Sequence, residues 1–262
     1  MGNNGQSMTH DSGGASWSGR VLTSTGFDGD QGAADPDLLA ALEYPQDETR
    51  LMRALTGARL LVPIVAIPAS SANDSGATDS KDPGDADLVE SFALNSATEM
   101  AVVTLTSSDG QRGLPVFSSV AALSAWDVTA RPSPVTSARA AQAAVAERCE
   151  VLLLDRGSEH ECILRPSMVW ALAQQRDWLP AHTDPFVAQA LSRATADEED
   201  VIDFIGESDP AGAGVLRVVL SLRAGLDAAD VQALATRVGE QIATDGEARA
   251  RIDALTFTIR QA

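Results

Sequence analysis

The stretch MAVVTLTSSDGQRGLPVF, residues 100–117, decides the fold because it predicts a β-hairpin. Residues 100–106 and 111–117 are rich in the β-branched and apolar residues that are typical of strands. Between them, Asp109-Gly110 suits a tight turn, since glycine adopts a positive φ without strain. We therefore expect two antiparallel strands near the middle of the chain.

Strand and helix patterns alternate on both sides of this hairpin. RLLVPIVAI, residues 59–67, is a continuous β-type run, although Pro63 cannot donate to a sheet and so predicts an edge or a bulge. Further extended segments are predicted at 131–135, 151–155 and 160–165. Helices are predicted after Asp35-Pro36, over 47–57, 118–126, 137–147 and 166–175, and after Asp184-Pro185. The fold class is therefore α+β, with a mixed β-sheet that contains the hairpin and packs with helices, plus a C-terminal strand–helix–strand unit.

Composition divides the chain into four parts. Residues 1–36 are predicted to be a disordered tail, and 37–194 an N-terminal domain with a flexible insertion at 70–87. Residues 195–214 hold seven acids and no base, which predicts an acidic linker; its apolar residues near 201–205 leave a short docking helix open.

Residues 215–262 are predicted to form the small C-terminal β-α-β unit. Strands at 215–222 and 255–259 flank an amphipathic helix that begins after Asp227. A unit of this size is marginal alone, so it should pack on the main domain or on a second copy.

Charge and cysteine content exclude several classes of protein. A formal net charge of −18 argues against sequence-independent binding of nucleic acid and against an anionic membrane surface. Two cysteines give no disulfide framework, and no signal peptide or spanning segment is recognised. We expect a cytoplasmic protein that binds neither nucleic acid nor membrane.

Catalytic, cofactor and metal motifs are not found in the sequence. There is no CxxC, HExxH or calcium-loop pattern, and no phosphate-binding glycine loop. His160 and Cys162 alternate on a predicted strand and would share a face, which gives a thiol–imidazole pair or simply a strand-start histidine and a core thiol. His182 precedes Asp184, which is explained as a helix cap. The sequence therefore predicts no enzyme, and no cofactor.

Tryptophan and arginine offer an interaction surface instead. These residue types dominate contact energies at interfaces, although a domain poor in aromatics also uses them in its core. The candidate partner surface comprises Phe117, Trp126, Arg131 and Pro132.

The stretch LPVFSSVAALSAWDVTARPSPV, residues 114–135, resembles the signature region of the SseB family, the bacterial "enhanced serine sensitivity" proteins. Similarity continues through GARLLVPIVA upstream and VLLLD, RPSMVWALAQQRDWLP and DPFVAQAL downstream, and is closest to actinobacterial members. The resemblance implies an α+β fold and a cytosolic protein, and it carries over no catalytic residue. It makes residues 37–194 an SseB-like N-terminal domain.

Three hypotheses of function follow. The first is a non-enzymatic interaction or regulatory module with a protein partner. The second is an enzyme with a thiol or histidine site near His160 and Cys162. The third is an acidic, chaperone-like partner of a basic protein. A homo-oligomer is left open.

Overall fold

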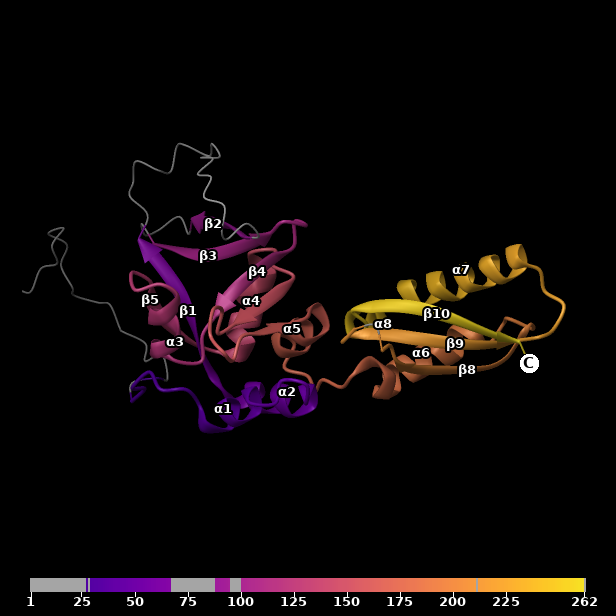
Figure 1. Ribbon diagram of the computed structural model, residues 1–262, viewed down its shortest axis with the longest axis horizontal. Coiled ribbons are helices and arrows are strands. Elements are labelled where there is room, and N and C mark those ends of the chain that lie inside the picture. Colours follow the sequence, from indigo (N-terminus) through magenta and orange to yellow (C-terminus); the bar gives the residue numbers. More distant parts are fainter. Residues whose placement is uncertain (1–26, 28, 67–87, 95–99, 211, 262) are drawn as a thin grey trace, which may run out of the picture. The chain divides into compact units, whose positions relative to one another are not determined.

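Figure 1 shows the computed structural model of the protein, which describes residues 27, 29–66, 88–94, 100–210 and 212–261. The chain divides into two units, Met1–Gln31 and Gly32–Ala262, and every element below belongs to the second. Residues 1–26 and 28 of the predicted tail, and the whole predicted insertion at 70–87, lie outside the described residues.

Seven strands form one mixed sheet around the hairpin, called the N-terminal sheet below. They are β1 (Arg59–Ala66), β2 (Leu88–Leu94), β3 (Met100–Ser107), β4 (Arg112–Val116), β5 (Arg131–Thr136), β6 (Val151–Leu154) and β7 (Cys162–Leu164). Their order is β5-β1-β3-β4-β6-β7, with β2 paired to the other edge of β3. Among the described strand pairs of this sheet, β4 and β6 are parallel and the others are antiparallel. The hairpin is confirmed, since β3 pairs with β4 and Gly110 has a φ of +88°.

Helices cover one face of this sheet and fill the first core. They are α1 (Pro36–Leu42), α2 (Glu48–Gly57), α4 (Ser137–Ala146) and α5 (Pro166–Ala173), while α3 (Val120–Trp126) lies on the opposite face. Side chains alternate along a strand, so every second residue faces these helices. The inward set is Leu60, Val62, Leu114, Val116, Leu152 and Leu154, all buried. The chain therefore has an α+β fold.

Prolines mark two special positions in β1 and β5. Leu61 N–H donates to Phe117 at 2.8 Å, so the nitrogens of Leu61 and of Pro63, two residues on, point away from β5. The Pro63 nitrogen carries no hydrogen to donate, and it lies where the partner of β1 changes from Phe117 to β3. Strand β1 is therefore an inner strand of the sheet rather than the predicted edge. Pro134 and Pro132 face Leu61 and Pro63 across the ladder. Both imino nitrogens thus lie on the free edge of β5.

Three strands form the C-terminal sheet, in the order β10-β9-β8. This sheet and the helices around it comprise η1 (Ala181–Thr183), α6 (Pro185–Thr195), β8 (Val201–Ser208), β9 (Val215–Leu222), α7 (Ala228–Thr244), α8 (Gly246–Arg251) and β10 (Ala254–Gln261). β9 and β10 are parallel and joined through α7, as the β-α-β pattern predicts, whereas β8 runs antiparallel to β9. Helices α6 and α7 cover one face of the sheet through a second core.

Two predictions about the region before β9 are wrong. Residues 201–208 form neither a linker nor a docking helix, but a strand paired along β9. In this strand Phe204 faces the second core while Asp203 and Ile205 point to the other face, a two-residue period that the acidic composition obscured. Helix α6, predicted within the N-terminal domain, packs its Val187 and Leu191 into the second core instead.

No helix in the described part of the chain is a candidate for spanning a membrane. None of them is both long enough and apolar enough to cross a bilayer.

Candidate functional site

One of the four residues of the predicted partner surface is buried, and the other three are at least partly exposed. Phe117 is 0% exposed, so its assignment to that surface is wrong. It follows β4 with its side chain on the face that α3 covers, where it packs with Leu61 and Leu123. Its ring lies 5.2 Å from that of Trp126, centroid to centroid. Phe117 therefore holds α3 on the sheet.

The other three residues of the predicted surface remain accessible. Arg131 and Pro132 are exposed at the start of β5, and Trp126 is half-buried at the end of α3. Trp126 packs against two clusters, one beneath α3 and one that continues across the sheet.

That second cluster forms the floor of a groove on the face of the N-terminal sheet opposite α1, α2, α4 and α5. The floor consists of Leu105, Val151 and Leu153, which are 4–8% exposed, together with Gly113. Ile163 of β7 stands at the side and is 51% exposed. A Cβ on Gly113 would lie 2.9 Å from Leu153, so only glycine leaves room for that leucine. The groove has a volume of about 420 Å³.

Two turns give the groove a polar rim. On one side the β3–β4 turn contributes Ser107, Asp109 and Gln111, and on the other the β6–β7 turn contributes an Arg156–Glu161 ion pair. The Ser107 hydroxyl bonds the Asp109 carboxylate and, with the Gln111 backbone, holds the pKa of Asp109 below its usual value. The groove thus combines an apolar floor with charged walls, as protein interfaces commonly do.

His160 and Cys162 do not share the strand that the hypothesis of a thiol–imidazole pair assumed. His160 lies in the turn before β7 rather than on the strand, and its Nε2 is 3.7 Å from Glu159. Burial, reinforced by the nearby Glu48 carboxylate, raises the pKa of the Cys162 thiol. A nucleophilic cysteine needs the opposite shift. Among the described residues, no three histidine, cysteine or acidic side chains are grouped to hold a metal ion.

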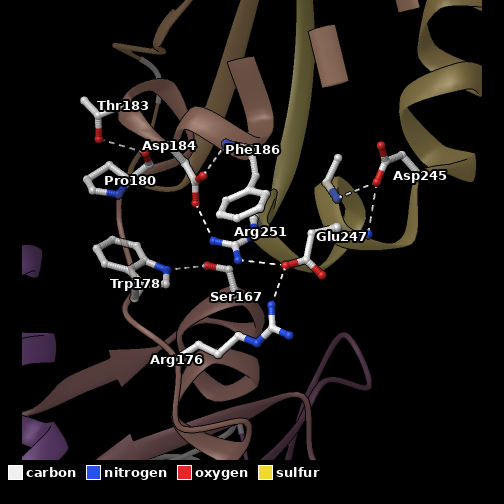
Figure 2. A network of polar contacts seen from close by, with 11 residues as sticks. Ser167, Arg176, Trp178, Pro180, Thr183, Asp184, Phe186, Asp245, Glu247 and Arg251 are labelled. Atoms are coloured by element: carbon white, nitrogen blue, oxygen red, sulfur yellow. Dashed lines mark hydrogen bonds and ion pairs between the residues drawn. The ribbon is translucent and has the colours of Figure 1, made fainter. Parts of the chain in front are cut away.

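A polar network centred on Arg251 joins α8 to the start of α6 and to Arg176, which follows α5 (Figure 2). The Arg251 side chain is 8% exposed and donates to Asp184 at 2.7 Å and to Glu247 at 2.8 Å. Its guanidinium carbon lies 4.3 Å from the centre of the Phe186 ring. Arg176 donates to the same Glu247 at 2.7 Å, which brings a residue beyond α5 into the network.

A second cluster extends this junction beside α5. Asp253 accepts hydrogen bonds from the Ser167 N–H at 2.7 Å, the Ser167 hydroxyl at 2.9 Å and Arg165 Nε at 2.9 Å. Arg165 also forms a bidentate pair with Glu48, and Trp178 Nε1 donates to the Ser167 hydroxyl at 3.0 Å. The C-terminal unit therefore packs on the main domain, one of the two arrangements the sequence predicts.

A cavity of about 370 Å³ borders the junction. Its charged lining residues include Glu48, Arg165, Arg251 and Asp253, and all four are engaged in the ion pairs just described. The groove on the N-terminal sheet is therefore the better candidate for a ligand from outside.

Sequence reasoning missed the buried pair of Asp155 and Ser118. Asp155 is 2% exposed, has a φ of +50°, and accepts from both the N–H and the hydroxyl of Ser118 at 2.7 Å. The two residues meet because β4 and β6 are parallel neighbours, so their carboxyl ends lie together. Asp155 follows an apolar run, but the sequence alone does not say which strand lies beside it.

Comparison with known proteins shows a family match. The family described as SseB protein N-terminal domain matches residues 37–171, just over half of the chain. No curated protein matches the chain, and no solved structure does.

Proposed function

We propose that this chain, which belongs to the SseB family, is a non-enzymatic protein-interaction module of the cytoplasm. Its N-terminal domain binds a segment of a partner protein in the groove between the β3–β4 turn and the β6–β7 turn. Secondary contacts come from the same domain, at Trp126 in the end of α3 and at Arg131 and Pro132 in the start of β5.

The observation that carries the proposal is the half-exposed Ile163 beside the groove's apolar floor. Helices α1, α2, α4 and α5 cover the opposite face of the sheet. On the groove's own face, the end of α3 is the only helical part among the described residues that packs against the cluster beneath the groove. An apolar side chain placed on Leu105 and Leu153 would be removed from water, which favours binding. The Arg156–Glu161 pair and Gln111 at the rim supply donors and acceptors that orient the segment.

The chemistry of the site argues for binding rather than catalysis. The described residues that line the groove include no cysteine or histidine, and the arginine among them is already paired with Glu161. Asp109 accepts a hydrogen bond from Ser107, which lowers its pKa further below the usual 3.8 and leaves it a poor proton donor. These groups recognise a partner's polar atoms, but they do not form a nucleophile–base pair.

Site-specific crosslinking in the native host tests the proposal. A photo-crosslinking amino acid at Gln111, an exposed rim position, should capture a defined protein. The variant Ile163→Asp should then reduce that adduct at least about tenfold, because a charge on the groove wall is desolvated on binding. The matched control is Val145→Asp, which alters a 59% exposed valine on α4 away from the groove.

Each outcome is decisive if both variants keep the unfolding midpoint of the parent. An adduct lost in Ile163→Asp and kept in Val145→Asp supports the groove. An adduct of equal yield in both variants, or no adduct at Gln111 while the same probe at Trp126 or Arg131 gives one, would show that the groove is not the binding site.

A further inference from the structure

The outer edge of β8 carries backbone groups that no strand uses in the described part of the chain. Asp209 N–H donates to Val215 at 3.1 Å, which places residue 209 in a hydrogen-bonded pair with β9. Alternate residues of an antiparallel strand point the same way, so Asp203, Ile205 and Glu207 also face β9. The N–H and C=O groups of Phe204 and Gly206 therefore point away from β9. Strand β8 is an edge strand of the C-terminal sheet (Figure 1).

Two isoleucines lie exposed on the same strand. Ile205 is 52% exposed on the sheet face opposite α6 and α7, and Ile202 is 58% exposed at a bulge in the pairing with β9. Long edges with exposed apolar residues are templates for another strand, and proteins usually block them. The edge of β5 is blocked in this way by Pro132 and Pro134, whereas β8 contains no proline.

Acidic side chains surround this edge. Asp197, Glu199 and Asp203 are all exposed, and Asp203 lies on the same face as Ile205. An acidic edge repels acidic segments and attracts basic ones, so these residues select the charge of whatever pairs with β8.

We propose that β8 is a strand-addition site for an extended basic segment of another protein, one in which every second residue is in turn basic and aliphatic, so that both kinds share one face of the added strand. The backbone of the segment bonds Phe204 and Gly206. Its aliphatic side chains cover Ile205 on the open face, and its basic side chains reach Asp203 and Glu199. This site is separate from the groove of the N-terminal sheet and does not depend on it.

A second copy of the chain fits this edge poorly. Antiparallel self-pairing centred on Gly206 would set Asp203 opposite Asp209 of the other copy, and it would do so twice by symmetry. Like charges directly opposite each other destabilise a strand pair. Charge therefore favours a basic partner over a homodimer through β8.

A peptide of defined chemistry tests the proposal on the full chain. The probe is the blocked heptapeptide Lys-Thr-Val-Thr-Lys-Thr-Val, which presents Lys and Val on one face, and its control is the same sequence with every backbone nitrogen methylated, which keeps the charge and removes the donors. The probe should slow amide hydrogen exchange at Phe204 and Gly206. The methylated peptide should bind at least about tenfold more weakly, as expected for two lost backbone hydrogen bonds.

Charge reversal on the protein supplies the second arm. Asp203→Lys should weaken binding of the probe about fivefold at low salt, whereas Glu240→Lys, which reverses an exposed acid on α7, should leave it nearly unchanged. Both sites are exposed, and equal urea midpoints establish that the variants fold. Equal binding of the two peptides would overturn strand addition. Equal effects of the two charge reversals, or protection at β10 in place of β8, would overturn the assignment to this edge.

Discussion

Asp253 caps helix α5 from a distance of 86 residues, because its Oδ1 accepts a 2.7 Å hydrogen bond from the Ser167 N–H. Arg165, at the N-cap position of α5, provides no side-chain cap of its own. The carboxylate also accepts from the Ser167 hydroxyl and from Arg165, so one side chain from the loop before β10 completes the start of a helix in the other core.

Replacing Asp253 by alanine should destabilise the protein by about 2–3 kcal/mol, because it leaves the helix N–H of Ser167 and the Nε of Arg165 without that acceptor, although Arg165 keeps its pair with Glu48. Urea unfolding measures the change. Glu240→Ala, at an exposed site on α7, is the control and should cost less than about 0.5 kcal/mol. Equal midpoints for the two variants would contradict the capping role.

The Arg251–Asp184 pair should show strong coupling. Arg251→Met leaves the 2% exposed Asp184 carboxylate without its cation and should cost about 3 kcal/mol. In the double variant with Asp184→Asn, part of that loss should return, with a coupling energy of about 1–3 kcal/mol. The asparagine can still accept from Phe186 N–H as the α6 cap. Additive losses in the cycle would mean that the two side chains do not stabilise each other.

Acid should weaken the fold through the Glu198–Arg237 pair. Arg237 donates to both carboxylate oxygens of Glu198, at 2.8 and 2.7 Å, and lowers the pKa of Glu198 below its usual 4.5. The folded state then binds fewer protons than the unfolded state, so the stabilisation is complete above the usual pKa and is lost as pH falls through the lowered one.

Arg237→Gln should accordingly flatten the fall in unfolding free energy between about pH 5 and pH 3. Urea midpoints across that range measure the slope. Arg260→Gln, which removes an exposed arginine of β10, is the control and should keep the parent's slope. A steeper fall in the Arg237 variant would reverse the sign of the argument.

The prolines of β5 should keep the N-terminal sheet from pairing with copies of itself. Pro132→Val combined with Pro134→Val restores two N–H donors on the free edge and should promote self-association. Ser133→Val is the matched control, because residue 133 faces β1 in its hydrogen-bonded pair with Val62. Sedimentation velocity at several concentrations distinguishes the variants. A double variant that sediments like the control would show that the prolines do not protect this edge.

Both thiols should react slowly in the folded protein. Burial raises the pKa of Cys149 to about 11, and it also raises the pKa of Cys162. Titration with Ellman's reagent near pH 8 should therefore be slower than for free cysteine and should accelerate for both thiols in denaturant. Cys162→Ser assigns the phases. A fast native phase that disappears in this variant would revive the hypothesis of a thiol enzyme.

Local signals predicted the elements whose determinants are close in sequence. The hairpin depends on a turn at Gly110, and the C-terminal β-α-β pattern depends on the cap at Asp227 and the apolar stripe of α7, so both were found. The caps at Asp35 and Asp184 are recognised for the same reason. Each of these features is determined within a few residues.

Features that depend on distant neighbours were not predicted. Phe117 is buried because α3 folds back over it, and Val187 and Leu191 face the second core because β8 and β9 follow them. The acidic residues of β8 obscure its strand pattern in the sequence. They lie on the open face and at the edge of the sheet, where a charged side chain stays in water and loses little hydration free energy. The groove needs β4 beside β6 and a turn at each end of this strand pair, an adjacency that no local pattern specifies.

The cap supplied by Asp253 also sets an order of events during synthesis. Ser167 emerges 86 residues before the side chain that completes its helix. At roughly 5–20 residues per second, the nascent chain carries an uncapped α5 for about 4–17 s. The last helix of the family domain therefore reaches its final stability only after residue 253 has been made.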